Sequence, residues 1–208
     1  MGCYSRYIFP WLLDKAMRAE PLRARRRRTL APASGRILEI GAGTGVNFEF
    51  YPDSVRSLET LDNNEGVQRR AARSAASARR QITAHLLSAE RLPFDDESFD
   101  SVVSTFTLCS IADVNAALSE VRRILKPGGQ FLFLEHGQAR ETNIARWQRR
   151  IEPIQKVIAD GCHLTRDIRA LVSDSGLVVS ACREGYMPKM PRVLAYLYEG
   201  RAQKVPLS

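Results

Sequence analysis

The fold of this chain is decided by residues Ile37–Gly45, which read ILEIGAGTG. The apolar residues predict a short buried strand, and three glycines at alternate positions predict a sharp turn directly after it. Glycine is used where a backbone has to bend tightly or approach a ligand closely. Glu39 places a carboxylate inside the strand, where such a group needs a partner. We expect a positively charged group of a bound, nucleotide-like ligand to supply that partner.

Strands and helices alternate on either side of this turn, which predicts an α/β fold. The predicted strands are 36–40, 57–61, 81–87, 99–104, 130–135, 177–181 and 193–198. The predicted helices are 4–30, 46–50, 66–80 and 114–125, and residues 140–175 are mostly helical. This order indicates a mostly parallel sheet with helices on both faces. The short connection before 193–198, which contains two prolines, favours an antiparallel last pair.

Length and composition predict one main domain with a small appendage. The chain has 208 residues, of which 44% are hydrophobic, enough for one sizeable core. We interpret residues 1–30 as an amphipathic helical lid or membrane-surface helix, and 31–208 as the main domain. No stretch has the roughly 18–20 apolar residues that a membrane span needs. The first ten residues hold no long apolar region, so we expect no secretory signal.

Charge and cysteine usage narrow the classes of partner. The net charge is +8, with arginine-rich segments near 15–28, 69–80 and 146–150. Solvated helix faces are the simplest interpretation, and an anionic membrane surface is the alternative. No aromatic residues interleave these runs, so we expect no nucleic-acid partner. The four cysteines form no CxxC pair, which argues against a metal site or disulfides and favours the reducing cytoplasm.

Open parallel sheets bind their ligands at the carboxyl ends of the strands. That rule brings the glycine turn together with Asp62, Ser88–Glu90, Thr105–Cys109 and His136 around one crevice. Asp62 follows the first glycine by about 20 residues, the spacing expected of a carboxylate that holds ribose hydroxyls. Its other interpretation is the N-cap of the following helix, and both roles are compatible.

Four motifs resemble those of the class I S-adenosylmethionine-dependent methyltransferases: Glu39–Gly45 (EIGAGTG), Asp62, Ala89–Phe94 (AERLPF) and Leu125–Gly129 (LKPGG). The resemblance implies a Rossmann-like, seven-stranded sheet whose last strand is antiparallel, with S-adenosylmethionine as the cofactor. Glu39 and the turn would face the methionine part, Asp62 the ribose, and Ala89 the adenine. Ser88 stands where many members have Asp. The implied cofactor-binding residues are Glu39, Gly41, Ala42, Gly43, Asp62, Asn63, Ser88, Ala89, Glu90 and Thr105.

Further strings resemble the mammalian membrane-associated thiol S-methyltransferases and their soluble bacterial relatives. They are 43–52 (GTGVNFEFYP), 107–110 (TLCS), 133–136 (FLEH), 147–148 (WQ) and 160–166 (DGCHLTR). This resemblance implies methylation of a small-molecule thiol or sulfide, although we expect no apolar anchor like that of the mammalian proteins. The same fold also suits methylation of a phospholipid amine or a quinone at a membrane surface. A third interpretation is a non-catalytic binder built on the cofactor fold.

The candidate residues for chemistry on a thiol lie outside the cofactor motifs. A thiol has a reference pKa near ~8.5 and needs only modest activation. His136, at the end of a strand, is a candidate base, and a hydrogen-bonded structural histidine is its alternative. Asp160 is a second catalytic candidate or a helix cap. Cys109, Trp147 and Cys162 are candidate walls of the acceptor pocket, with ordinary core packing as the alternative.

Overall fold

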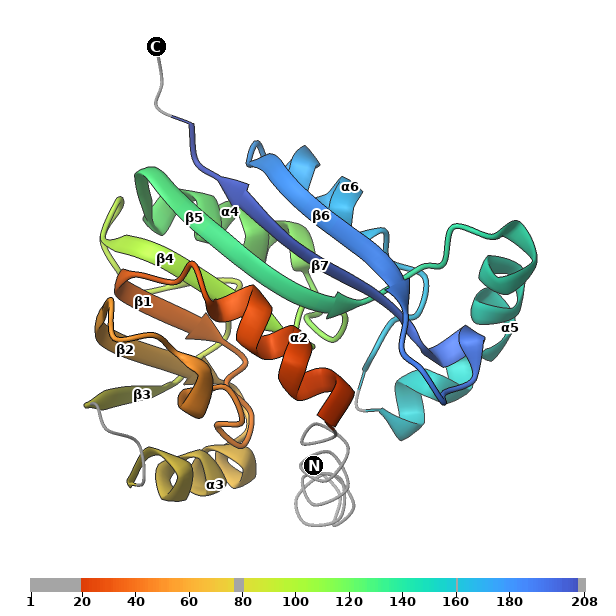
Figure 1. Cartoon of the computed structure of the whole chain (residues 1–208), viewed down its shortest axis with the longest axis horizontal. Coiled ribbons are helices and arrows are strands. Elements are labelled where there is room, and N and C mark those ends of the chain that lie inside the picture. The colour runs from red at the N-terminus through yellow and green to blue at the C-terminus, as the bar shows by residue number, and fades with distance from the viewer. Residues whose placement is uncertain (1–19, 77–80, 160, 206–208) are drawn as a thin grey trace.

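A seven-stranded sheet crosses the molecule, and the computed structural model describes residues 20–76, 81–159 and 161–205 (Figure 1). The strands are β1 (Gly35–Ile40), β2 (Val55–Asp62), β3 (Ile82–Leu86), β4 (Phe99–Thr105), β5 (Leu125–His136), β6 (Val178–Tyr186) and β7 (Tyr196–Gln203). Their order across the sheet is β3-β2-β1-β4-β5-β7-β6. The pairs from β3 to β5 are parallel, and β7 is antiparallel to both β5 and β6. The predicted fold class is confirmed.

Helices cover both faces of this sheet. They are α2 (Glu20–Leu30), α3 (Glu65–Ala76), α4 (Val114–Ile124), α5 (Thr142–Ile158) and α6 (Ile168–Asp174). In Figure 1, α2 crosses in front of the sheet, and α4 and α6 lie behind it. The core is divided accordingly, because side chains alternate between the two faces of a strand. Leu38 and Ile40 pack with α4 and α6, whereas Ile37 packs with the end of α2 and with α3.

The central strands are buried almost without interruption. Residues 37–40 of β1 pair with 58–61 of β2 and 101–104 of β4. All four of these β1 residues are fully buried, as expected of a parallel strand that is covered on both faces. The glycine turn therefore follows a strand with little freedom to move, and its position relative to the neighbouring strand ends is well defined.

The structure differs from the sequence prediction in three segments. β5 begins at Leu125 and so includes the Pro-Gly-Gly segment, which precedes the predicted strand 130–135. The reason is tertiary: Gly128 donates to the Lys204 carbonyl, and Lys204 donates to the Gly129 carbonyl. The last strand also starts later than expected, because residues 192–194 form a 3-10 turn. Residues 48–50 likewise form only a 3-10 turn.

The predicted 1–30 lid is described only from residue 20 onward. Within that part, α2 packs directly on the sheet, with Leu22 against Leu134 of β5 and Leu197 of β7. Residues 1–19 lie outside the described residues, and their role as a lid stays a prediction. None of the helices in the described ranges is long and apolar enough to cross a membrane.

Candidate active site

The glycine turn after β1 has a backbone that few other residues could adopt. Gly41 and Gly43 have φ values of 66° and 58°, in the left-handed region that is costly for residues with a Cβ. A Cβ on Gly41 would also lie 2.1 Å from the Thr107 hydroxyl oxygen. Gly41 and Ala42 both donate to the Leu61 carbonyl, at 2.8 and 3.2 Å. The turn is thus held against the end of β2 and under the loop that follows β4.

Asp62 joins the turn to the end of β2. Its carboxylate accepts hydrogen bonds from the backbone N–H of Gly43 at 3.1 Å and from that of Asn64 at 2.9 Å. The alternative role as cap of α3 belongs instead to Asn64, whose side chain accepts from Gly66 and Val67. These two hydrogen bonds place the Asp62 carboxylate directly beside the glycine turn.

Glu39 is fully buried, and side chains of the protein itself donate hydrogen bonds to both of its carboxylate oxygens. Asn47 donates to one carboxylate oxygen at 2.6 Å, and the Tyr51 hydroxyl donates to the other at 2.8 Å. Burial raises the pKa of Glu39 to about 7, and these two hydrogen bonds and the positive charge of Arg26 oppose the rise. The sequence expectation that a ligand cation must supply its partner is therefore corrected.

Arg26 of α2 is the functional-site residue that the sequence analysis missed. Its side chain is only 1% exposed and donates to the side-chain oxygens of Asn47 at 2.6 Å and Thr105 at 2.9 Å. Burial lowers its pKa to about 10, so it stays charged at neutral pH. Arg26 lies inside a run of basic residues that the sequence analysis interpreted as a solvent-exposed helix face. A helical period that places Leu22, Arg26 and Leu30 on one side was the available signal.

A second buried carboxylate organises the loop after β4. Glu135 of β5 accepts from the Ser104 hydroxyl at 2.7 Å and from the Thr107 N–H at 2.9 Å. Burial raises its pKa to about 7, and hydrogen bonds from Ser104 and from three backbone N–H groups oppose the rise. Phe106 enters the loop with φ of 55°, which is rare for a bulky residue and typical of strained functional sites.

His136, Cys109 and Cys162 meet beside this loop. The Cys162 sulfur lies 3.7 Å from His136 Nδ1, and His136 Nε2 is buried with no hydrogen-bond partner among the described residues. The thiol of Cys109 contacts that of Cys162, raising its own pKa and lowering the pKa of Cys162. His136 lies on the α2 side of the sheet, because it is two residues from Leu134, which contacts Leu22. The structure thus brings three predicted residues together.

The other predicted cofactor-binding residues lie outside the cluster of His136, Cys109 and Cys162. Ala89 is buried in the core, while Ser88 donates to Glu90 at 2.5 Å and Glu90 accepts from the Asp113 N–H at 2.9 Å. These two hydrogen bonds hold the pKa of Glu90 below its ordinary value. Asn63 is exposed.

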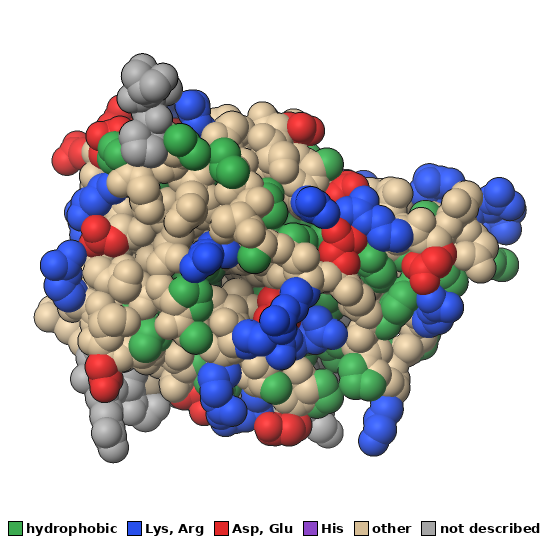
Figure 2. Space-filling view, turned by 45° about the horizontal axis from the view of Figure 1, so that its top comes forward, with side chains coloured by type: hydrophobic (Ala, Val, Ile, Leu, Met, Phe, Trp, Pro, Cys, Tyr) green, Lys and Arg blue, Asp and Glu red, His purple; other side chains and the backbone are tan. Residues whose placement is uncertain are grey.

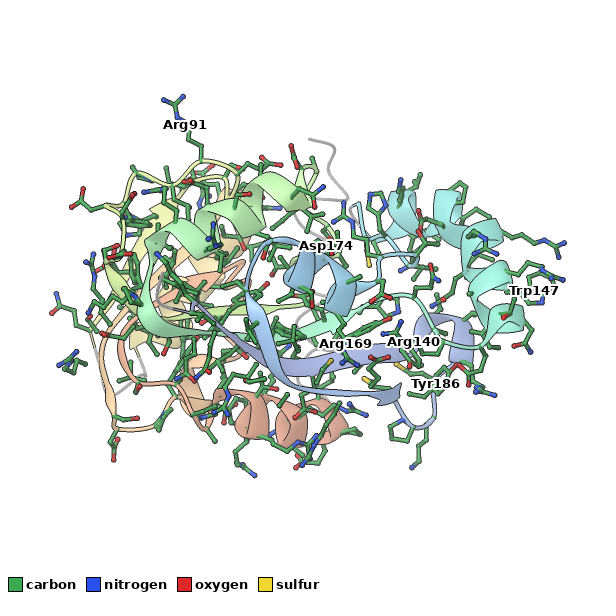
Figure 3. All side chains as sticks on the ribbon, turned by 90° about the horizontal axis from the view of Figure 1, so that it is seen from above. Arg91, Arg140, Trp147, Arg169, Asp174 and Tyr186 are labelled. Atoms are coloured by element: carbon green, nitrogen blue, oxygen red, sulfur yellow. The ribbon has the colours of Figure 1, made fainter. Side chains whose placement is uncertain are left out.

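Trp147 lies on the exposed side of α5, at the end of the molecule (Figure 3), rather than among the buried residues around His136. Asp160 lies outside the described residues. Asp167 caps α6, and its carboxylate accepts from the Ala170 N–H. His163 pairs with Glu152 at 3.3 Å.

Comparison with known proteins identifies the domain. A family described as "Methyltransferase domain" matches residues 38–133. The thiol S-methyltransferase TMT1B of Rattus norvegicus is 40% identical over 137 residues, covering 63% of this chain and 55% of the relative. The demethylmenaquinone methyltransferase of Clavibacter sepedonicus is 37% identical over 109 residues, covering 52% and 44%. A crystal structure of a putative methyltransferase from Bacillus halodurans superposes with a TM-score of 0.70 at 16% identity, covering 88% of this chain and 98% of that one.

Residues 38–133 form a class I S-adenosylmethionine-dependent methyltransferase domain. The chain spans about half the length of the curated relatives it matches. S-adenosylmethionine is the cofactor of this methyltransferase, and the turn suits it. The Cβ position of Gly43 has no atom nearer than the Gly41 carbonyl oxygen at 3.9 Å, which leaves its backbone open to close approach. The adjacent Asp62 offers acceptors for hydroxyl groups, and no phosphate-binding cation is needed.

Proposed function

We propose that this methyltransferase transfers a methyl group from S-adenosylmethionine to the sulfur of a small-molecule thiol or sulfide. The observation that carries the proposal is the buried, unpartnered Nε2 of His136 beside the Cys162 and Cys109 thiols. A buried polar atom without a partner is costly, and a hydrogen-bonding ligand would remove that cost. The likeness to the thiol S-methyltransferases supports the same choice of acceptor.

The contact with Cys162 suggests which nitrogen of His136 is the base. Because the pKa of Cys162 is lowered, chiefly by the hydrogen bond from Cys109, its sulfur is suited to accept a hydrogen bond from His136 Nδ1–H. The proton on Nδ1 leaves the lone pair on Nε2, since a neutral imidazole carries one N–H. Nε2 would then take the proton of the thiol. The acceptor sulfur bonds to the methyl carbon as the carbon–sulfonium bond breaks.

We assign cofactor binding to the turn and its neighbours. Asp62 would hold the ribose, and the backbone at Gly43 would lie against the methionine part. Glu39 and Arg26 lie behind this surface as a buried pair of opposite charges joined through Asn47. S-adenosylmethionine supplies the methyl group on a cationic sulfur. The chain's own contribution is alignment of the acceptor, exclusion of water and removal of one proton.

Turnover of thiols, amines, phenols and quinols, read as release of S-adenosylhomocysteine, tests the acceptor. Thiols should be substrates and amines should not. His136→Ala should lower turnover of an alkyl thiol by roughly 100-fold or more, the scale of general base catalysis, with little change in cofactor affinity. The loss of turnover caused by His136→Ala should be smaller for an acidic aromatic thiol, because such a thiol enters the site already deprotonated. An equal loss of turnover and cofactor binding would assign His136 a structural role.

The pair Cys162→Ser and Cys162→Ala separates orientation of His136 from packing. A serine oxygen can still accept from Nδ1–H, so it should keep more activity than alanine. Cys182→Ser is the matched control, because Cys182 lies on β6 and outside this cluster.

Carbon methylation of a quinol is the second candidate, supported by the likeness to demethylmenaquinone methyltransferases. Turnover of a quinol and not of thiols in the same panel would favour it.

A further inference from the structure

Helix α5 carries a ridge of large apolar side chains that the fold leaves in solvent. Trp147, Ile154 and Ile158 are 53%, 63% and 56% exposed. Their spacing of seven and four residues places them on one side of a helix. The opposite side packs on the protein through Ala145 and Gln148, which are both buried. We call Trp147, Ile154 and Ile158 the α5 ridge.

A basic strip runs beside the α5 ridge. Arg146, Arg149 and Arg150 are exposed, and none of the ion pairs found among the described residues involves them. The Arg150 guanidinium lies 5.1 Å from the centre of the Trp147 ring. This differs from α2, where Arg23 pairs with Glu49 and Arg28 with Glu199. In Figure 2, Lys and Arg side chains and hydrophobic side chains both appear on the projecting end of the molecule that α5 forms in Figure 1.

We propose that α5 is a docking surface for an anionic lipid membrane, with the α5 ridge inserted at the interface and the arginine strip against the lipid headgroups. An exposed apolar stripe beside arginines is the arrangement of helices that lie in a membrane interface. Trp is favoured at that depth, and long basic side chains extend to the headgroups. A second copy of the chain is the poorer occupant, because a two-fold contact through α5 would bring the arginine strips of both copies together.

This surface is joined directly to the acceptor site. The chain leaves β5 at His136, forms α5 from Thr142 to Ile158, and returns at Cys162. Docking through α5 would therefore hold the His136 and Cys162 side of the molecule near the bilayer, where lipophilic acceptors concentrate. The docking surface itself does not depend on which acceptor is methylated, so its test needs no substrate.

Tryptophan fluorescence of the full chain with vesicles provides the direct test. The chain has two tryptophans, Trp11 and Trp147, so Trp11→Phe leaves Trp147 as the reporter. Its emission should shift to the blue with phosphatidylcholine–phosphatidylglycerol vesicles, and much less with phosphatidylcholine alone. In Trp147→Phe, Trp11 reports on the N-terminal segment. A shift confined to Trp11 would overturn the proposal.

Vesicle co-sedimentation measures how much the arginine strip contributes to membrane binding. Loss of all three arginines should weaken partitioning by roughly a hundredfold at low salt, about fivefold for each charge, and high salt should weaken the parent protein similarly. The test variant combines Arg146→Gln, Arg149→Gln and Arg150→Gln, and the control of equal charge combines Arg91→Gln, Arg183→Gln and Lys189→Gln. Equal effects of the two triple variants would refute a specific α5 surface.

The contribution of the α5 ridge is tested with a matched pair of variants. Ile154→Ser should weaken partitioning, whereas Leu86→Ser, at a similarly exposed apolar residue on β3, should not. Unchanged thermal melting and S-adenosylmethionine binding would show that each variant is folded. If size-exclusion chromatography shows a dimer that Ile154→Ser dissolves, and vesicles bind neither form, the ridge is an interface between two copies and the proposal is wrong.

Discussion

Replacing Arg26 with Met tests whether the buried cation stabilises the site. The change keeps an apolar stem of similar length and removes the charge beneath Glu39. It breaks the hydrogen bonds to Asn47 at 2.6 Å and Thr105 at 2.9 Å, each worth about 1.5–3 kcal/mol for a charged donor. We expect a loss of roughly 3–5 kcal/mol in the free energy of unfolding, the scale for breaking a buried charge pair, out of a typical total of about 5–15 kcal/mol.

The pH dependence of that loss identifies its cause. Burial raises the folded-state pKa of Glu39 from 4.5 to about 7, so the folded protein takes up a proton as pH falls through this window. The stability cost of this raised pKa is absent below 4.5 and complete above 7. Arg26 opposes the rise, so Arg26→Met should raise the pKa of Glu39 further. Its cost should be largest at pH 8 and smaller at pH 5, where Glu39 is protonated in the folded state.

Urea denaturation at the two pH values, with Glu39→Gln as the second background, completes the test. In Glu39→Gln the cost of Arg26→Met should lose the part of this pH dependence that comes from titration of Glu39. Glu135 also has a pKa raised by burial to about 7 and its charge also acts on Arg26, so the difference between the two backgrounds, rather than either one alone, isolates the contribution of Glu39. A cost below ~1 kcal/mol, or one that is equal in both backgrounds and at both pH values, would refute the reasoning.

Two further predictions concern the turn. Asp62→Ala should weaken S-adenosylmethionine binding by roughly 1–3 kcal/mol, the cost of leaving polar partners unpaired, and unchanged affinity in calorimetry would remove Asp62 from the site. Gly41→Ala should lower the melting temperature much more than Gly128→Ala. Both glycines have a positive φ, but a Cβ meets Thr107 at 2.1 Å in the first and nothing within 4 Å in the second; equal melting temperatures would show that the Thr107 contact does not matter.

The fold and the cofactor were predictable because their signals are local. A strand buried on both faces needs an apolar run, and a tight turn needs glycine. The adjacent residues of Ile37–Gly45 meet both requirements. The alternation of strands with helices limits the sheet to few topologies. Boundaries were less predictable at Pro127 and Gly128, since that segment becomes part of β5 only through its hydrogen bonds with Lys204.

The structure alone assigns partners to the buried charges. Arg26 reads as one more arginine in a basic run, and only the packing of α2 on the sheet buries it beside Asn47 and Thr105. Asn47 and Tyr51 could not be recognised as the partners of Glu39 until the turn folded back over β1. Such pairings depend on how elements that are distant in the sequence pack against one another. Residue type alone does not determine that packing.

The sequence by itself determined the class of this protein: an α/β sheet with a glycine turn after β1, an acidic residue after β2 and S-adenosylmethionine as cofactor. The strand and the turn follow from burial and backbone geometry within short segments, and the cofactor follows from the resemblance of the motifs to those of class I methyltransferases. Only the tertiary structure decided that His136 meets Cys162 from across α5, and that Trp147 lies in solvent. Residues that are 26 positions apart become neighbours through the return of the chain, and a helix shows which of its sides is exposed only once the other side is packed.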